Sequence, residues 1–381
     1  MIPYGRQEVT DDDCAAVLEV LKSDYLTQGE VVPAFERAVA DRVGASFGVA
    51  CNSATSALHI ACMALDLGPG DSLWTVPVSF VASANCALYC GATVDFVDVD
   101  ENSGALCLAS LESKLLQAEN DRKLPKILVV VHLAGHPYNV AKLRALCEPR
   151  GVHIVEDASH AIGAERYSDA VGSCSDSVVT VFSFHPVKIV TSAEGGVATT
   201  NDEVLARRMG ELRTHGVTKD NAHFSKPSHG PWYYEQQALG FNYRLSELHA
   251  ALGVSQLSRL DNYVGRRAEI AGYYLQNLKG CTLVLPDEGT RSSWHLAIVL
   301  LPADRKSAKQ SVFEKLRREG IGVNVHYIPI HTQPYYLGLG FKQGDYPNSE
   351  SFYERAISLP LYPTMTDCDL DRCVTAVNSV L

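Results

Sequence analysis

The sequence has no excess of positive charge. Its 381 residues include 33 lysines and arginines against 44 aspartates and glutamates, which gives a net charge of −11. Without a basic field, a protein cannot displace counterions from nucleic acid or adhere to an anionic membrane by bulk attraction. The charge balance therefore argues against bulk nucleic-acid binding and against adhesion to anionic membranes. An anionic ligand would need a local basic pocket.

Long apolar runs are also missing. No stretch reaches the ~18 consecutive apolar residues of a membrane span, and the first residues contain no apolar core of signal-peptide length. We therefore expect a cytoplasmic protein. The 11 cysteines are an odd number and include no C-x-x-C pair. We expect reduced thiols, and neither a disulfide framework nor a zinc site.

Two histidine pairs have the spacing of metal ligands, His132 with His136 and His326 with His331. Neither pair comes with the carboxylate or cysteine partners that zinc needs, so we predict no metal site. No G-x-G-x-x-G turn opens the first helix of the alternating region, which argues against a nicotinamide dinucleotide site.

The length of the chain predicts either two domains or one large domain with a smaller lobe. From about residue 46 to 200, short apolar strands alternate with helical stretches, which is typical of an α/β domain with a mostly parallel sheet. Expected strands are 47–51, 72–76, 93–97, 127–131, 153–155 and 178–182, and expected helices are 54–67, 80–90, 111–119 and 140–149. Ligands of such sheets gather at the carboxyl ends of the strands.

The second half of the chain indicates a further lobe. Residues 245–278 carry apolar residues at helical spacing over a length that could bridge two domains, and a strand at 295–301 with a helix at 311–319 follows. The segment 219–231 reads as a long loop. The expected division is a large domain at 12–245 and a smaller C-terminal α/β domain at 246–381, to which residues 1–11 contribute.

Lys188 is the most informative residue. It ends the run Phe182-Ser183-Phe184-His185-Pro186-Val187-Lys188 after an apolar strand pattern, and Thr191-Ser192-Ala193-Glu194-Gly195-Gly196 follows. Most lysines are solvated surface charges, but an amine held partly desolvated at a strand end can form a Schiff base. Some thirty residues upstream, another strand ends in Glu156-Asp157. A lysine and a carboxylate at neighbouring strand ends are two parts that a pyridoxal phosphate (PLP) enzyme needs.

Asp157 has two possible roles at this stage. It could cap the turn that follows its strand. With Lys188 nearby, it could instead pair with the pyridine nitrogen of the cofactor and keep that nitrogen protonated, so that the ring accepts electrons from a carbanion. A buried opposite charge typically shifts a pKa by about one to three units, which is enough to hold a pyridinium at neutral pH.

The segment Asn52-Ser53-Ala54-Thr55-Ser56 follows a strand and opens a helix. Simple N-capping is one interpretation. The accessible amides of the first turn, together with the helix dipole, also make a phosphate site. Ser183, at another strand end, could give a hydroxyl to the same phosphate. Because Asp157 and Lys188 belong to the same pattern, we favour the phosphate site.

Two further residues are candidates for contacts with the cofactor ring. Phe80 follows Pro77-Val78-Ser79 at a strand end, where an aromatic side chain could stack on a planar cofactor or simply join the core. His160, three residues after Asp157, could contact the phenolic oxygen of the cofactor or could cap a helix start.

Together these segments resemble the DegT/DnrJ/EryC1/StrS family of sugar aminotransferases, which are fold-type I PLP enzymes. The resemblance runs nearly end to end. It is carried by Asn52-Ser53-Ala54-Thr55, Glu156-Asp157-Ala158-Ser159-His160, Ser183-Phe184-His185-Pro186-Val187-Lys188, Ala193-Glu194-Gly195-Gly196 and Gly240-Phe241-Asn242-Tyr243-Arg244.

The resemblance implies roles for individual residues. Lys188 would bind the cofactor covalently, and Asp157 would pair with its pyridine nitrogen. Ala54, Thr55 and Ser183 would contact the phosphate. Asn242 would reach the phosphate of a neighbouring subunit, which implies a homodimer with shared active sites. Many family members have glutamine where His160 stands. Some relatives replace the lysine by histidine and act as dehydratases, so the lysine kept here favours transamination.

Within the family, three segments look most like the branch that makes UDP-4-amino-4,6-dideoxy-N-acetyl-β-L-altrosamine in pseudaminic acid biosynthesis. They are Ile2-Pro3-Tyr4-Gly5-Arg6-Gln7, Phe184-His185-Pro186-Val187-Lys188 and Val325-His326-Tyr327-Ile328-Pro329-Ile330-His331. This implies glutamate as amino donor and a UDP-linked 4-keto sugar as acceptor. Tyr4, Arg6, His326 and His331 are then the candidate substrate-binding residues.

Other functions use the same residues. A transaminase for a different nucleotide keto-sugar, or a fold-type I lyase or aldolase, would employ the same lysine and aspartate. A non-catalytic PLP-binding regulatory protein is the alternative from another class. The intact lysine and the lack of an appended DNA-binding segment argue against it.

Overall fold

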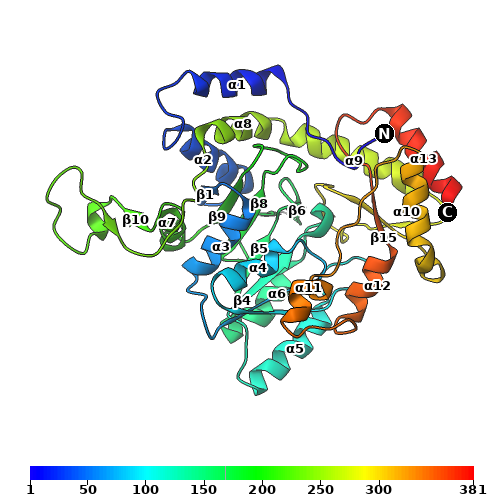
Figure 1. The fold of residues 1–381 in the computed structure, drawn as a ribbon, viewed down its shortest axis with the longest axis horizontal. Coiled ribbons are helices and arrows are strands. Elements are labelled where there is room, and N and C mark those ends of the chain that lie inside the picture. Colours follow the sequence, from blue (N-terminus) through cyan, green and yellow to red (C-terminus); the bar gives the residue numbers. More distant parts are fainter. Residues whose placement is uncertain (168) are drawn as a thin grey trace.

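The computed structural model describes residues 1–167 and 169–381. Its centre is a sheet with the strand order β1-β9-β8-β5-β4-β2-β3 (Figure 1). These strands are β1 (Phe47–Cys51), β2 (Ser72–Thr75), β3 (Thr93–Phe96), β4 (Ile127–Val131), β5 (His153–Asp157), β8 (Val179–Ser183) and β9 (Gly196–Thr200). The strands expected from the sequence are present, with ends that differ by at most two residues.

The sheet is mostly parallel, as expected. β3, β2, β4, β5 and β8 run parallel to one another, whereas β9 runs antiparallel to both β8 and β1. β9 was not predicted, because its Gly-Val-Ala-Thr-Thr sequence is short and opens with a glycine. A Cβ on Gly196 would lie 2.4 Å from the backbone nitrogen of Ala54. Glycine is therefore required where β9 passes close to the start of α3 (Ala54–Ala64).

Helices cover both faces of the sheet. β4 is buried along its whole length, as expected for a strand with both faces covered. Ile127 and Val129 pack on one side with α3 (Ala54–Ala64), α4 (Ala82–Tyr89) and α7 (Glu203–Leu212). Leu128 and Val130 pack on the other side with α5 (Leu108–Asn120) and α6 (Val140–Cys147).

The expected helices are also present, with shifted ends. α3 stops at Ala64 rather than at residue 67, because Asp66 has a positive φ of 57° that no regular helix contains. The stretch 245–278 forms two helices, α8 (Glu247–Leu257) and α9 (Leu260–Asn277), rather than one. At the break, Arg259 donates to Asp13 of α1 (Asp11–Leu21), which lies along α8 in Figure 1.

A second lobe contains the C-terminal part of the chain. Its sheet has the order β12-β14-β15 and is antiparallel. The elements are β12 (Thr282–Leu283), β14 (Ala297–Leu300), β15 (Ala356–Leu359), α10 (Lys309–Arg318), α11 (Pro334–Gly338), α12 (Pro347–Arg355) and α13 (Asp367–Val380). Ile2 pairs with Ile321 and joins the core of this lobe. α8, however, packs with α2 (Val31–Val43) in a core that includes β8 and β9. The division at residue 245 stays a prediction.

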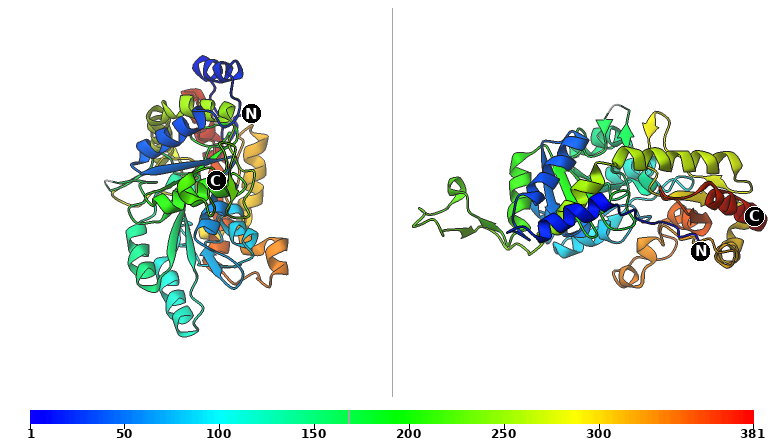
Figure 2. Two further views of the ribbon diagram at one scale, coloured as in Figure 1. Left: turned by 90° about the vertical axis from the view of Figure 1, so that its left-hand side faces the viewer. Right: turned by 90° about the horizontal axis from the view of Figure 1, so that it is seen from above.

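The expected loop at 219–231 lies within a projecting hairpin. Its base is the antiparallel pair β10 (Val217–Thr218) and β11 (Glu235–Gln236). Figures 1 and 2 show it extending away from the rest of the molecule. A further small sheet joins β6 (Glu165–Arg166), β7 (Asp169–Ala170) and β13 (Thr290–Arg291). No helix in the described part of the chain combines the length and apolar character needed to cross a membrane.

Candidate active site

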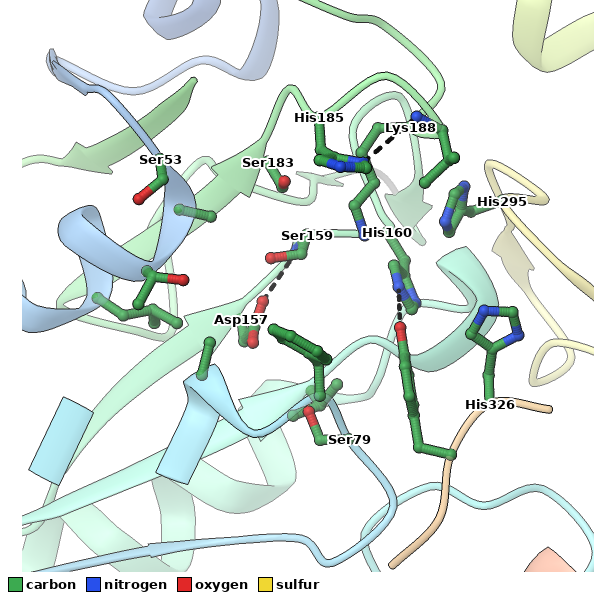
Figure 3. Close-up of a pocket in the computed structure, with 18 of the residues that line it drawn as sticks. Ser53, Ser79, Asp157, Ser159, His160, Ser183, His185, Lys188, His295 and His326 are labelled. Atoms are coloured by element: carbon green, nitrogen blue, oxygen red, sulfur yellow. Dashed lines mark hydrogen bonds between the residues drawn. The ribbon is translucent and has the colours of Figure 1, made fainter. Parts of the chain in front are cut away.

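A cavity of about 360 Å³ lies at the carboxyl ends of β1, β5 and β8. Residues of the C-terminal lobe close its other side. Nine residues selected from the sequence line it: Tyr4, Ala54, Thr55, Phe80, Asp157, His160, Ser183, Lys188 and His326. Segments that are far apart in the sequence therefore meet in one pocket, as Figure 3 shows for the labelled side chains.

The start of α3 forms one wall. Ser53 caps the helix, and its Oγ accepts the backbone N–H of Ser56 at 3.1 Å. The first intrahelical bond runs from the Ala57 amide to the Ser53 carbonyl. The amides of Ala54 and Thr55 are therefore first-turn donors without an acceptor inside the helix. Such a helix start favours a phosphate group, and Ser183 lines the same cavity.

Asp157 ends β5 with its side chain 5% exposed. Its Oδ1 accepts the backbone N–H of Ser159 at 3.1 Å, and its Oδ2 accepts the hydroxyl of Ser83 at 2.5 Å. The carboxylate also lines the cavity. A buried acceptor in this position is suited to a cationic N–H group of a bound ligand.

Lys188 lies in the turn that follows β8, where its backbone N–H bonds to the carbonyl of His185 at 2.9 Å. Burial lowers the pKa of its amine to about 8, although the negative charge of Asp157 opposes this shift. An amine with this pKa is uncharged in a useful fraction of molecules near neutral pH, as a nucleophile or base must be. Figure 3 shows Lys188 in the same pocket as Asp157 and His160.

Three histidines surround the amine. His160 Nε2 and the Tyr327 hydroxyl form a hydrogen bond of 3.0 Å. The ring centroids of His160 and His295 lie 4.4 Å apart. Burial and the nearby positive charge of Lys188 hold the pKa of His160 well below its usual value, and the pKa of His326 falls to about 4 for the same reasons. These rings stay neutral at pH 7, so they add no positive charge that would repel a protonated group.

His295 and Tyr327 were not singled out from the sequence. Both line the cavity, but His295 precedes an apolar strand and Tyr327 lies in a short irregular segment. Nothing in their local pattern distinguishes them from core residues. Only the approach of the C-terminal lobe brings them to the lysine.

Three sequence-selected residues do not line this cavity. His331 is fully buried beneath the C-terminal lobe, where its Nε2 lies 2.9 Å from Glu350 Oε1 and its ring packs against Tyr346. Its predicted contact with substrate is not supported, because the His331 side chain contacts Glu350 and Tyr346 in the protein interior and does not line the cavity. Arg6 and Asn242 are exposed and lie outside the pocket of their own chain.

The two histidine pairs have other partners. His132 Nε2 lies 2.7 Å from Glu156, and His136 bonds to the hydroxyl of Ser292 at 2.7 Å. Within residues 1–167 and 169–381, no group of three or more His, Cys, Asp or Glu side chains is placed to hold a metal ion.

The pocket fits PLP in several independent ways. The first-turn amides of α3 would hold the phosphate, Asp157 the pyridine nitrogen and Lys188 the aldehyde carbon. Phe80 is 59% exposed and lines the cavity, where its ring is available for stacking.

Known proteins are similar to this chain in sequence and in fold. The sequence profile of the DegT/DnrJ/EryC1/StrS aminotransferase family matches residues 7–378. SpsC, a spore coat polysaccharide biosynthesis protein of Bacillus subtilis, is 37% identical over 388 residues, which cover 100% of this chain and 97% of SpsC.

Solved structures give the same result. Helicobacter pylori PseC, an aminotransferase involved in the biosynthesis of pseudoaminic acid, matches with a TM-score of 0.91 at 32% identity, over 100% of this chain and 98% of PseC. A Streptococcus pneumoniae protein assigned as a sugar aminotransferase matches in its PMP form with a TM-score of 0.91 at 27% identity, over 100% and 99% of the two chains. Its PLP form matches with a TM-score of 0.89. The chain therefore belongs to the DegT/DnrJ/EryC1/StrS aminotransferase family and is a PLP-dependent sugar aminotransferase of fold-type I.

Proposed function

We propose that this enzyme transfers an amino group from glutamate to the 4-keto carbon of UDP-2-acetamido-2,6-dideoxy-β-L-arabino-hexos-4-ulose. The product would be UDP-4-amino-4,6-dideoxy-N-acetyl-β-L-altrosamine. The observation that carries the chemistry is the meeting of the Lys188 amine, whose pKa burial lowers to about 8, with Asp157 in one pocket at the start of α3. A cytoplasmic location would give the enzyme access to nucleotide sugars.

Each pocket residue has a role in this proposal. Ala54, Thr55 and Ser183 bind the phosphate of PLP, Asp157 binds its ring nitrogen, and Phe80 stacks on the ring. His160, which follows β5, contacts the phenolic oxygen of the cofactor.

Bound PLP supplies an electron sink that stabilises negative charge on the carbon bonded to the transferred nitrogen. Lys188 removes the proton from the α-carbon of glutamate and later delivers a proton to carbon 4 of the sugar. His295 and His326 are buried side chains that line the cavity, and they limit water on their side of it. Exclusion of water protects reactive species from hydrolysis.

The similarity to PseC supports the choice of sugar. Tyr4 and His326 line the cavity with their ring centroids 5.6 Å apart. They come from the N-terminal segment and the C-terminal lobe and offer polar groups for a nucleotide sugar. We propose these two residues as substrate contacts.

A panel of nucleotide keto-sugars tests the substrate. The purified enzyme, loaded with PLP and supplied with glutamate, is expected to prefer the β-L-arabino 4-keto sugar in kcat/KM, and NMR should identify the 4-amino product. A wide preference for the D-xylo epimer or for a 3-keto sugar would show that the substrate is wrong, while the aminotransferase assignment would stand.

We also propose a homodimer in which Asn242 acts on the partner's cofactor. Asn242 is exposed and lies beside the base of the projecting hairpin, where it pairs with Thr214. It is therefore placed on the outside of its own subunit. Its predicted phosphate contact requires a pocket other than the one in its own chain.

Mixed dimers test this arrangement. Lys188→Ala and Asn242→Ala protomers are each expected to be nearly inactive. After subunit exchange, a mixed dimer should hold both lesions in one site and leave the other site intact, so that about one quarter of wild-type activity returns from random pairing in a symmetric dimer. The control mixes Lys188→Ala with Asp157→Asn. Both of those residues line the pocket of one chain, so no recovery is expected. Equal behaviour of the two mixtures would contradict the shared site.

A further inference from the structure

Ser83 of α4 is a fully buried residue that touches the proposed partner of the cofactor ring. Its Oγ donates to Asp157 Oδ2 at 2.5 Å. Hydrogen bonds to an ionised carboxylate are shorter and stronger than those between neutral groups. Ser83 itself does not line the cavity, so any effect on the cofactor must act through Asp157.

A second serine extends this contact. Ser79 Oγ lies 2.7 Å from Ser83 Oγ, and Ser79 is 3% exposed at the edge of the cavity. A serine hydroxyl has a single proton to donate. Because Ser83 gives its proton to the carboxylate, Ser79 must donate to Ser83. The result is a directed chain from Ser79 through Ser83 to Asp157.

The chain holds one side of the carboxylate, and the backbone holds the other. Ser159 N–H donates to Oδ1 at 3.1 Å. Over the described residues, these two are the hydrogen bonds that the Asp157 side chain makes. With a donor on each oxygen, rotation of the carboxylate about its last bond is restricted. Each oxygen can still accept another bond, and the carboxylate faces the cavity (Figure 3).

We infer that Ser83 is a positioning residue: it fixes the orientation in which Asp157 meets the ring nitrogen of PLP, with Ser79 fixing the hydroxyl of Ser83. This inference rests on the proposed role of Asp157. α4 begins two residues after Phe80, so the same helix start places the proposed stacking ring and the donor to the carboxylate. The start of α4 therefore positions the Phe80 ring relative to Asp157, the proposed partner of the cofactor nitrogen.

Ser83→Ala tests the inference on the full-length enzyme. We expect the Kd for PLP, measured by fluorescence quenching, to rise about 10-fold, the scale of losing one hydrogen bond to a charged group. The rate of the half-reaction with glutamate should fall by about the same factor, with little change in the glutamate concentration for half-saturation. The pH titration of the bound-cofactor absorbance should move in the same direction as in Asp157→Asn, by a smaller amount. Ser79→Ala should give the same pattern more weakly.

Thr75→Val is the matched control. Thr75 is fully buried on β2, the strand that precedes α4, and its hydroxyl bonds to the Val129 carbonyl at 3.0 Å without contacting Asp157. Its loss should lower the Tm of the apo-enzyme and leave the titration unchanged. If Ser83→Ala behaves like Thr75→Val, with a lower Tm and wild-type titration and Kd, Ser83 only packs and the inference is overturned. If Asp157→Asn itself leaves the titration unchanged, the proposed role of Asp157 fails first.

Discussion

Replacing Lys188 by alanine is expected to reduce kcat by roughly 10³–10⁴-fold, because the enzyme loses both its covalent attachment to PLP and its general base. PLP should still bind through the start of α3 and Asp157, which do not depend on the lysine. Removal of a desolvated amine leaves no polar group behind, so the variant should fold. The measurement combines steady-state turnover with borohydride reduction, which marks PLP that is attached to the protein.

The exposed Lys219 provides a matched control. Lys219→Ala removes the same side chain from the hairpin, away from the pocket, and should keep wild-type turnover and reducible attachment. If Lys188→Ala retained a reducible linkage, another amine would hold the cofactor and the assignment of Lys188 would be wrong.

Asp157→Asn is expected to lower kcat by about 10²–10³-fold, the scale of losing one preorganised electrostatic partner. Without a negative charge, the pyridine nitrogen is less protonated and the ring is a poorer electron sink. The fold should persist. An asparagine keeps the oxygen that accepts from Ser159, and the Ser83 hydroxyl can turn to accept from the new amide. The measurement is the single-turnover rate with glutamate, alongside the absorbance of the bound cofactor as a function of pH.

Asp202→Asn is the control for this substitution. Asp202 caps α7 through the amide of Val204 at 2.7 Å, and asparagine caps a helix about as well as aspartate. Its activity and absorbance should match the wild type. Turnover near the wild-type level in Asp157→Asn would favour the simple capping role that the sequence left open.

The local sequence was sufficient for most of the parallel sheet. Ile127 to Val131 are apolar without interruption, which is typical of a strand with both faces covered, and they form such a strand here. It was also sufficient for Lys188, Asp157 and the start of α3, because each follows a strand and carboxyl ends of parallel strands meet at one edge. The family followed from these motifs in their order along the chain.

Other features were decided by the tertiary structure alone. β9 has no distinctive pattern, and its antiparallel direction follows from pairing with β8 and β1. His295 and Tyr327 enter the pocket only when the C-terminal lobe packs against the sheet. His331 has the same local appearance as His326, yet Glu350 and Tyr346 enclose it. Ser83 lies 74 positions from Asp157 and looks like any helical serine.

The physical reason is that the two groups of features depend on interactions of different range along the chain. Strand and helix formation, capping and the placement of residues at strand ends depend on neighbours within a few positions, and the sequence displays those neighbours directly. Hydrogen bonds such as Ser83 to Asp157 and burial such as that of His331 depend on which distant segments come into contact. Those contacts are set by the packing of helices and lobes as a whole. The residues that carry the proposed chemistry could therefore be predicted from the sequence, whereas the positions of their side chains relative to one another were decided by the tertiary structure.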